Sequence, residues 1–98
     1  MTPLSPANAK RVAILFSAKE AAKASKLIEQ ECSENLDRSP ELLERIQTAV
    51  IKVSNGTMER LEWAIAMAQT DWRDLLVEAG FAHDIELHKA WWPSENAS

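Results

Sequence analysis

The sequence predicts an all-α protein, a single domain over residues 1–98 with four to five helices, and its composition supports this. The chain has 98 residues, the usual size of one domain. Only two residues are glycine. Strong helix formers (Ala, Leu, Glu, Lys, Gln, Arg and Met) fill 53 positions, whereas the β-branched residues Val, Ile and Thr fill 14. Hydrophobic residues make up 46% and charged residues 27%. These totals exclude a strand-rich chain and wholesale disorder.

The first helix is the least determined part of the chain, and a serine cap predicts the second. Residues 1–16 contain Ser5-Pro6, which is typical of a helix start, and a short apolar run whose length does not separate helix from strand. We favour a helix there, because no second convincing strand exists to pair with it. Ser17 and Glu20 have the spacing of a capping box and predict a helix over residues 18–33.

The two middle helices are expected at residues 40–54 and 58–69. Ser39 before Pro40 predicts the start of the first, and its apolar residues recur at the spacing of one helix face. On this helix, Glu41 and Arg45 have the spacing of an i, i+4 ion pair. Gly56 is expected to end it as a left-handed residue. Because residues 63–68 are apolar all round, we expect helix 58–69 to be buried at the centre of the domain.

Two shorter helices are expected at the C-terminal end. Thr70 or Asp71 caps a helix over about 71–79, which Gly80 ends. The last helix is predicted over about 83–92, and Pro93 stops it. Residues 94–98 are expected to form a frayed polar tail.

The charge distribution bears on partners and location. The formal net charge is −4, which disfavours nucleic acid as a partner, because phosphate binding usually needs a basic surplus. Residues 1–26 are basic and residues 27–98 acidic, which indicates either two solvated faces or a bipolar surface for association. The apolar run Val12–Phe16 is too short for a signal peptide, and no run is long enough to cross a membrane. We therefore expect a cytoplasmic protein.

No residue pattern indicates catalysis, a cofactor or a metal site. His83 and His88 project about 140° apart on a helix, so they do not share a metal as an i, i+4 pair does. Asp84 and His88 have that spacing, but no third ligand is spaced to help them. Cys32, the single cysteine, is expected to be a core thiol without a disulfide. Both glycines are used as helix stops, which leaves none for a phosphate loop or a moving lid.

The tryptophans supply the candidate interaction surface. Trp63 and Trp72 fit inward-facing stripes and are expected in the core. Trp91 and Trp92 point about 100° apart on a helix, so at most one of them faces the core squarely. The pair either binds a partner or a second copy of the chain, or it seals the domain internally. The candidate surface consists of Trp91, Trp92 and the partly buried His88.

Two resemblances concern the last third of the chain. The turn Ala79-Gly80-Phe81, followed by a helix, resembles a helix-turn-helix and the turn of AraC-type regulators, which implies a nucleic-acid-associated regulator. However, the segment in the place of the recognition helix contains Asp84 and Glu86 with one lysine, Lys89, whereas DNA contact favours Arg and Lys. This function is therefore the alternative.

Residues 71–81, with Asp84, His88 and Trp91, resemble a recurring signature of small, uncharacterised all-helical bacterial proteins, over about residues 15–93. This resemblance implies a bacterial single-domain protein and transfers no active site. The expected function is a small cytoplasmic protein-interaction or regulatory protein without catalysis. Its partner is expected to be an unidentified protein or a second copy.

Overall fold

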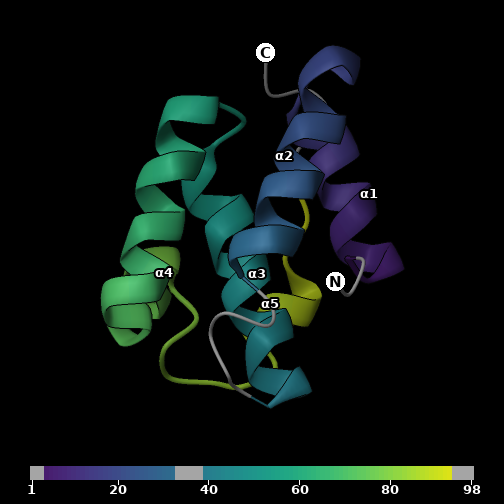
Figure 1. Cartoon of the computed structure of the whole chain (residues 1–98). Helices are drawn as coiled ribbons and strands as arrows, with labels where there is room; N and C mark the ends of the chain where they lie inside the picture. The colour runs from purple at the N-terminus through teal and green to yellow at the C-terminus, as the bar shows by residue number, and fades with distance from the viewer. Residues whose placement is uncertain (1–3, 33–38, 94–98) are drawn as a thin grey trace.

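The computed structural model describes residues 4–32 and 39–93, and within these ranges it contains helices and no strands (Figure 1). The prediction of an all-α fold is confirmed. None of the helices in these ranges is both long and apolar enough to cross a bilayer. In chain order the helices are α1 (Pro6–Leu15), α2 (Ala18–Glu31), α3 (Pro40–Ser54), α4 (Met58–Ala79) and α5 (Leu87–Ala90).

The first four helices begin where the sequence places a hydroxyl residue. In each case the side-chain oxygen of the cap accepts a hydrogen bond, at 3.2–3.3 Å, from the backbone N–H three residues later. A proline follows the cap in α1 and α3, where its missing N–H costs nothing. The four capping residues are Ser5, Ser17, Ser39 and Thr57.

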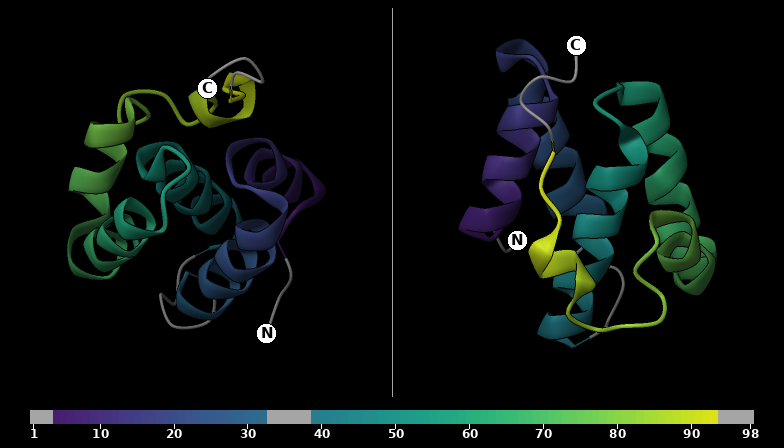
Figure 2. Two further views of the ribbon diagram at one scale, coloured as in Figure 1. Left: turned by 90° about the horizontal axis from the view of Figure 1, so that it is seen from above. Right: turned by 180° about the vertical axis from the view of Figure 1, so that it is seen from behind.

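Helix α3 lies at the centre of the bundle, and the other helices surround it (Figure 2). It packs most extensively on α4, and it also contacts α1 and α5. Its buried side chains run almost without interruption from Ile46 to Ser54 and include the polar Gln47 and Thr48. Gln47 donates to the backbone oxygen of Cys32 at 2.7 Å, which ties α3 to the end of α2. This central position matters because α3 supplies one wall of the site described below.

The structure differs here from the expectation for residues 58–69. That part of α4 buries only one face, through Leu61, Ala64, Ile65 and Ala68. Trp63 was expected in the core but is 42% exposed, and the guanidinium of Arg60 lies 4.7 Å from its ring centroid. The reason is geometric: at 100° per residue, Trp63 points about 150° away from the centre of this buried face. Trp72, the other tryptophan expected in the core, is half-buried.

Helices 58–69 and 71–79 are joined into one bent helix. Asp71 has non-helical backbone angles (φ −152°, ψ 82°) in the middle of α4. Its Oδ1 accepts a hydrogen bond from the N–H of Asp74 at 3.3 Å, which is the geometry of an N-cap. Asp71 therefore caps the second half of α4, as predicted for the separate helix.

Both glycines have left-handed backbone angles, with φ of 81° at Gly56 and 80° at Gly80. Asn55, at the end of α3, is also left-handed (φ 51°). Gly56 has a second constraint, since a Cβ on it would lie 2.7 Å from the carbonyl oxygen of Leu15. The turn after α3 thus packs directly on the end of α1.

The predicted last helix, 83–92, is wrong: only Leu87–Ala90 are helical. Upstream, the carboxylate of Asp84 accepts from the N–H of Glu86 at 2.8 Å and forms a local turn instead. Downstream, Pro93 disfavours a helical conformation at the residue before it. The predicted tail, 94–98, and the last residue of helix 18–33 lie outside the described residues.

Candidate interaction site

Residues 81–93, hereafter the C-terminal segment, cross the bundle (Figure 2). The buried side chain of Arg11 holds them in place. The guanidinium donates to three backbone oxygens, those of His88 (3.0 Å), Lys89 (3.3 Å) and Trp91 (3.1 Å). Carbonyls at the end of a helix lack partners within the helix, so a cation with several donors suits them. A fourth bond, to Asn8 Oδ1 at 2.9 Å, fixes the guanidinium to its own helix.

The two adjacent tryptophans lie outside α5 and have different surroundings. Trp91 is half-buried, and its ring centroid lies 6.5 Å from that of Phe81. Trp92 is 44% exposed and covers Arg11, whose Cζ lies 4.3 Å from its ring centroid. Both rings thus contact the bundle, while Trp92 also presents a partly exposed face.

His88 is almost completely buried, with 4% of its surface exposed. Its ring meets that of Phe81 edge-on at a centroid distance of 6.4 Å. Its Nδ1 is buried and has no hydrogen-bond partner. His83 and Asp84, by contrast, are exposed. The sequence expectation of a partly buried His88 thus understates its burial.

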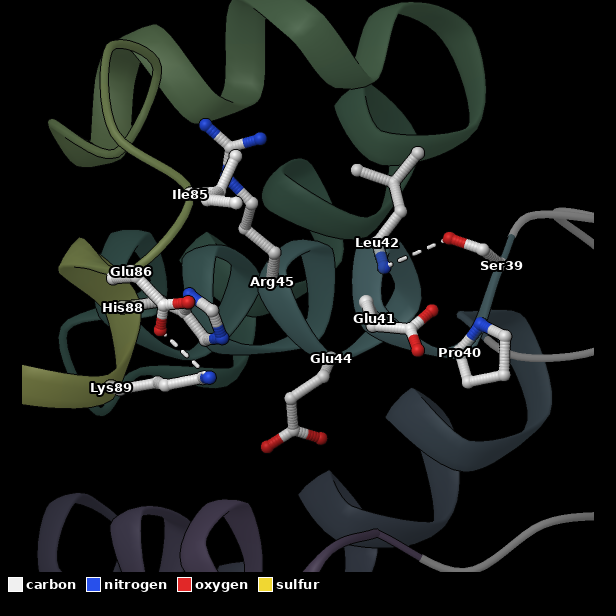
Figure 3. A pocket seen from close by; sticks show the side chains of 10 residues that line it. All are labelled: Ser39, Pro40, Glu41, Leu42, Glu44, Arg45, Ile85, Glu86, His88 and Lys89. Atoms are coloured by element: carbon white, nitrogen blue, oxygen red, sulfur yellow. Dashed lines mark hydrogen bonds and ion pairs between the residues drawn. The ribbon is translucent and has the colours of Figure 1, made fainter.

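A pocket of about 550 Å³ opens between the first half of α3 and the C-terminal segment. His88 and Lys89 reach from α5 toward the side chains of α3 (Figure 3). The size is within the range of small-molecule and side-chain binding sites. Its lining residues are Ser39, Pro40, Glu41, Leu42, Glu44, Arg45, Ile85, Glu86, His88 and Lys89.

Two of the side chains that line this pocket contain buried polar atoms without a partner, namely Arg45 Nε and His88 Nδ1. Arg45 uses another of its nitrogens, Nη2, to donate to the backbone oxygens of Phe81 (2.6 Å) and Ala82 (3.2 Å). It therefore also positions the start of the C-terminal segment. Both unpartnered atoms are inaccessible to solvent, so they lie behind the surface of the pocket rather than on it.

Burial keeps His88 neutral near pH 7. Desolvation lowers the pKa of its imidazole, and the positive charges of Lys89, Arg11 and Arg45 lower it further. The Glu44 carboxylate acts in the opposite direction but does not reverse the shift. A neutral imidazole has one N–H donor and one acceptor nitrogen.

Most other charges around the pocket already have partners. Glu86 and Lys89 form an ion pair at 2.7 Å. The carboxylate of Glu44 accepts from the hydroxyl of Ser5 at 2.7 Å, which links the pocket to the start of α1. Glu41 is exposed in the first turn of α3. With three carboxylates and two cationic side chains in its lining, the pocket does not attract anions.

Among the described residues, no group of three or more His, Cys, Asp or Glu side chains is placed to hold a metal ion. Cys32 is buried and unbonded, as expected. Burial, with a smaller contribution from Glu31, raises the pKa of its thiol to about 12, so it is not a nucleophile near neutral pH.

Sequence reasoning missed the two arginines that build the site. Arg11 lies one turn after Asn8, on the buried face of α1, and this spacing is the only local signal of its burial. Arg45 was expected to pair with Glu41, but its guanidinium turns instead to the carbonyls of Phe81 and Ala82. Those partners are 36 and 37 residues away in sequence, which no local pattern reveals.

The turn that resembles a helix-turn-helix is present, but the second helix is not. Phe81 N–H donates to the Leu76 oxygen at 2.8 Å across the left-handed Gly80. The segment after it, 82–86, forms turns rather than a recognition helix. Within the described residues, only the four-residue helix α5 stands in the place of a recognition helix, and the regulator function stays a prediction.

Comparisons of the chain with models of protein families, with curated proteins and with solved structures found no match.

Proposed function

We propose that the protein is a small, non-catalytic interaction protein that binds a partner protein in the pocket between α3 and the C-terminal segment. The observation that supports this most strongly is the pocket itself, about 550 Å³ in volume, with the apolar side chains of Pro40, Leu42 and Ile85 in its lining.

The rim of the pocket supports binding as well. Ile85 lines the pocket and is 68% exposed, so an apolar surface lies at the pocket itself. Apolar side chains beside a concave site with a few polar groups are typical of binding surfaces. A partner seated in the pocket would cover Ile85.

A binding role accounts for the polar groups better than a catalytic role does. Arg45 donates to the backbone of the C-terminal segment and so holds the two walls together, and Glu44 accepts from Ser5 and ties α3 to the start of α1. Glu86 is paired with Lys89. These contacts shape the pocket, and they leave the neutral His88 without a partnered nucleophile or acid to work with.

The pocket, rather than the tryptophan pair, is the centre of this proposal. Trp91 packs toward Phe81 and Trp92 covers Arg11, so internal sealing explains their main contacts. Self-association through the exposed face of Trp92 remains a prediction. A cytoplasmic location and a bacterial origin also remain predictions from the sequence.

Affinity capture with matched variants tests the proposal. Ile85→Glu places a charge at the pocket, and Val77→Glu places the same charge on α4, outside the pocket lining. The two side chains are equally exposed, at 68% and 65%, so neither change should unfold the protein. Wild type and both variants are immobilised and incubated with native extract, and the retained proteins are identified by mass spectrometry.

We expect a discrete protein that wild type and Val77→Glu retain and that Ile85→Glu does not. Circular dichroism of the variants confirms that each is folded. If Ile85→Glu retains the same proteins as wild type, or if nothing is retained by any of the three, the pocket is not the binding surface and the proposal fails.

A further inference from the structure

The pocket between α3 and the C-terminal segment has two chemically different ends. Leu42 and Ile85, the apolar end, lie in the upper half of the view in Figure 3, and the carboxylates of Glu41 and Glu44, the acidic end, lie in the lower half. Residues three positions apart are neighbours on a helix, which places the two carboxylates on the same side of α3. An occupant of the whole pocket therefore needs an apolar part and a part that suits negative charge.

The carboxylates of the acidic end are not neutralised by their own neighbours. Glu41 is exposed and forms no hydrogen bond or ion pair with any residue that the structure describes. Glu44 accepts from the hydroxyl of Ser5 through Oε2, and a hydroxyl does not compensate the charge of a carboxylate. At least one carboxylate of the lining is thus accessible and ready to pair with a cation.

The two cationic side chains of the lining have other partners. Lys89 is paired with Glu86 at 2.7 Å. Arg45 donates to backbone oxygens of the C-terminal segment, and its guanidinium lies with the apolar end in the upper half of Figure 3. The negative charge of the acidic end therefore stays uncompensated, and it attracts a cationic group and repels an anionic one.

We propose that the acidic end of the pocket binds an arginine side chain of the partner protein, whose guanidinium pairs with the Glu41 carboxylate. A guanidinium is planar and weakly hydrated and pairs bidentately with a carboxylate, whereas a lysine ammonium is strongly hydrated and binds as a point charge. The alkyl stem of arginine also packs on apolar surface, which Pro40 supplies beside Glu41. This inference rests on the proposed function, and it specifies the charge of the group that enters the site.

The arginine belongs to a different protein rather than to a second copy of this chain. Among the described residues, the exposed arginines are Arg60 and Arg73, and each already lies over a tryptophan ring of its own chain. The guanidinium carbon is 4.7 Å from the Trp63 centroid in the first case and 5.2 Å from the Trp72 centroid in the second. Pairing with a second copy would compete with these contacts.

An NMR titration of the ¹⁵N-labelled protein tests the inference with N-acetyl-argininamide as the probe. N-acetyl-citrullinamide is the matched control, because its side chain has the same length and shape but no charge. We expect shifts in the backbone amides of residues 41–45, with a dissociation constant on the order of 1–10 mM for the arginine probe. The citrulline probe should bind about fivefold more weakly, because it forms no ion pair with a carboxylate.

Two glutamate variants test whether Glu41 recognises the charge. Glu41→Gln removes the accessible carboxylate, so the preference for the arginine probe should fall to about twofold or less. Glu59→Gln is the matched control and should leave the preference at about fivefold, because Glu59 is also exposed and lies in the first turn of its own helix, α4. Dispersed spectra show that each variant is folded. In about 1 M salt the wild-type preference should disappear, because exposed charges are then screened within about 3 Å.

Equal binding of the two probes to wild type, shifts confined to other parts of the chain, or an unchanged preference in Glu41→Gln would overturn the arginine assignment. Shifts of residues 41–45 with protein concentration alone would also overturn it, because a second copy would then occupy the pocket. The capture experiment decides the proposed function separately, since Ile85 lies at the apolar end: retention that depends on Ile85 supports the pocket even where the arginine probe fails.

Discussion

A single buried side chain, Arg11, determines the path of the last part of the chain. It donates to the backbone oxygens of His88, Lys89 and Trp91, and Trp92 covers its outer face. Because the guanidinium is buried, these carbonyls would have no comparable donor without it. The position of His88 in the pocket therefore depends on a residue 77 positions earlier in the sequence.

We predict that Arg11→Met lowers the free energy of unfolding by about 3 kcal/mol, since it removes charged hydrogen bonds to three buried or partly buried carbonyls. The same variant should become sensitive to chymotrypsin at Trp91, whose following bond does not precede a proline. Lys10→Met is the control, because Lys10 is exposed and its Nζ lies 5.8 Å from the centroid of the Trp92 ring. Urea denaturation measures both, and equal stabilities of the two variants would contradict the role of Arg11.

His88 should make the stability pH-dependent. Burial lowers its pKa in the folded state below the usual value of about 6.5, so the unfolded chain binds the proton more readily. Stability is therefore fully present above that value and is lost as the pH falls below it. The charged groups that face the imidazole are Glu44, Lys89, Arg11 and Arg45.

Urea denaturation at several pH values from about 7.5 to about 5.5 measures the effect. Wild type and His83→Gln should both lose stability toward pH 5.5, and His88→Phe should lose markedly less. His83 is the matched control because it is exposed. A slope that persists in His88→Phe would show that another group is responsible.

The environment of a single side chain was predicted correctly for Cys32 but not for Trp63 or for the two arginines. Cys32 was expected to be a core thiol and is buried. Trp63 was assigned to the core from its apolar neighbours, yet it points away from the face that Ala64 buries. The burial of Arg11 and the contacts of Arg45 depend on distant carbonyls, so their roles follow only from the folded structure.

At the level of the helices, the starts and most ends follow from local chemistry. Hydroxyl caps act on backbone N–H groups three residues later, which is why four helix starts are recognisable in the sequence. The length of the last helix was overestimated, because contacts outside its own apolar pattern set where it begins and ends. The backbone oxygen of His88 accepts a hydrogen bond from the Arg11 guanidinium. At the other end, the turn formed by Asp84 replaces the predicted beginning of the helix.

The two glycines provide a matched prediction at this level. Gly80→Ala should cost about 1 kcal/mol of unfolding free energy, since it only places a Cβ on a left-handed residue, with the nearest side-chain atom 3.8 Å away. Gly56→Ala should cost about 3 kcal/mol, because its Cβ would also meet the Leu15 oxygen at 2.7 Å and separate the α3–α4 turn from α1. Thermal denaturation ranks the two, and equal losses would contradict the close approach at Gly56.

For the whole molecule, composition was enough to predict the all-α class, because glycine is scarce and helix formers dominate. The identity of the central helix was not predictable in the same way. Residues 63–68 look enclosed in sequence, but α3 is the helix that α1, α4 and α5 all contact. Periodicity shows which face of a helix is apolar, but it does not show how many neighbouring helices cover that helix, because this depends on how the helices pack.

The pocket is a property of the whole fold in the same sense. Its walls come from residues 39–45 and 85–89, which Arg45 joins through the Phe81 and Ala82 carbonyls. His88 was already part of the candidate surface from the sequence, as a partly buried residue beside the tryptophans. Its place opposite α3, and the unpartnered Nδ1, emerge only when the C-terminal segment is folded back onto the bundle.

The measurement that tests the central claim most directly is site-specific photo-crosslinking in the living cell. A benzophenone amino acid replaces Ile85 in the pocket lining or, as the control, the equally exposed Val77 on α4. We predict one adduct of discrete mass from position 85 and none from position 77. No adduct from position 85, or the same adducts from both positions, would contradict the claim that this pocket is where a partner binds.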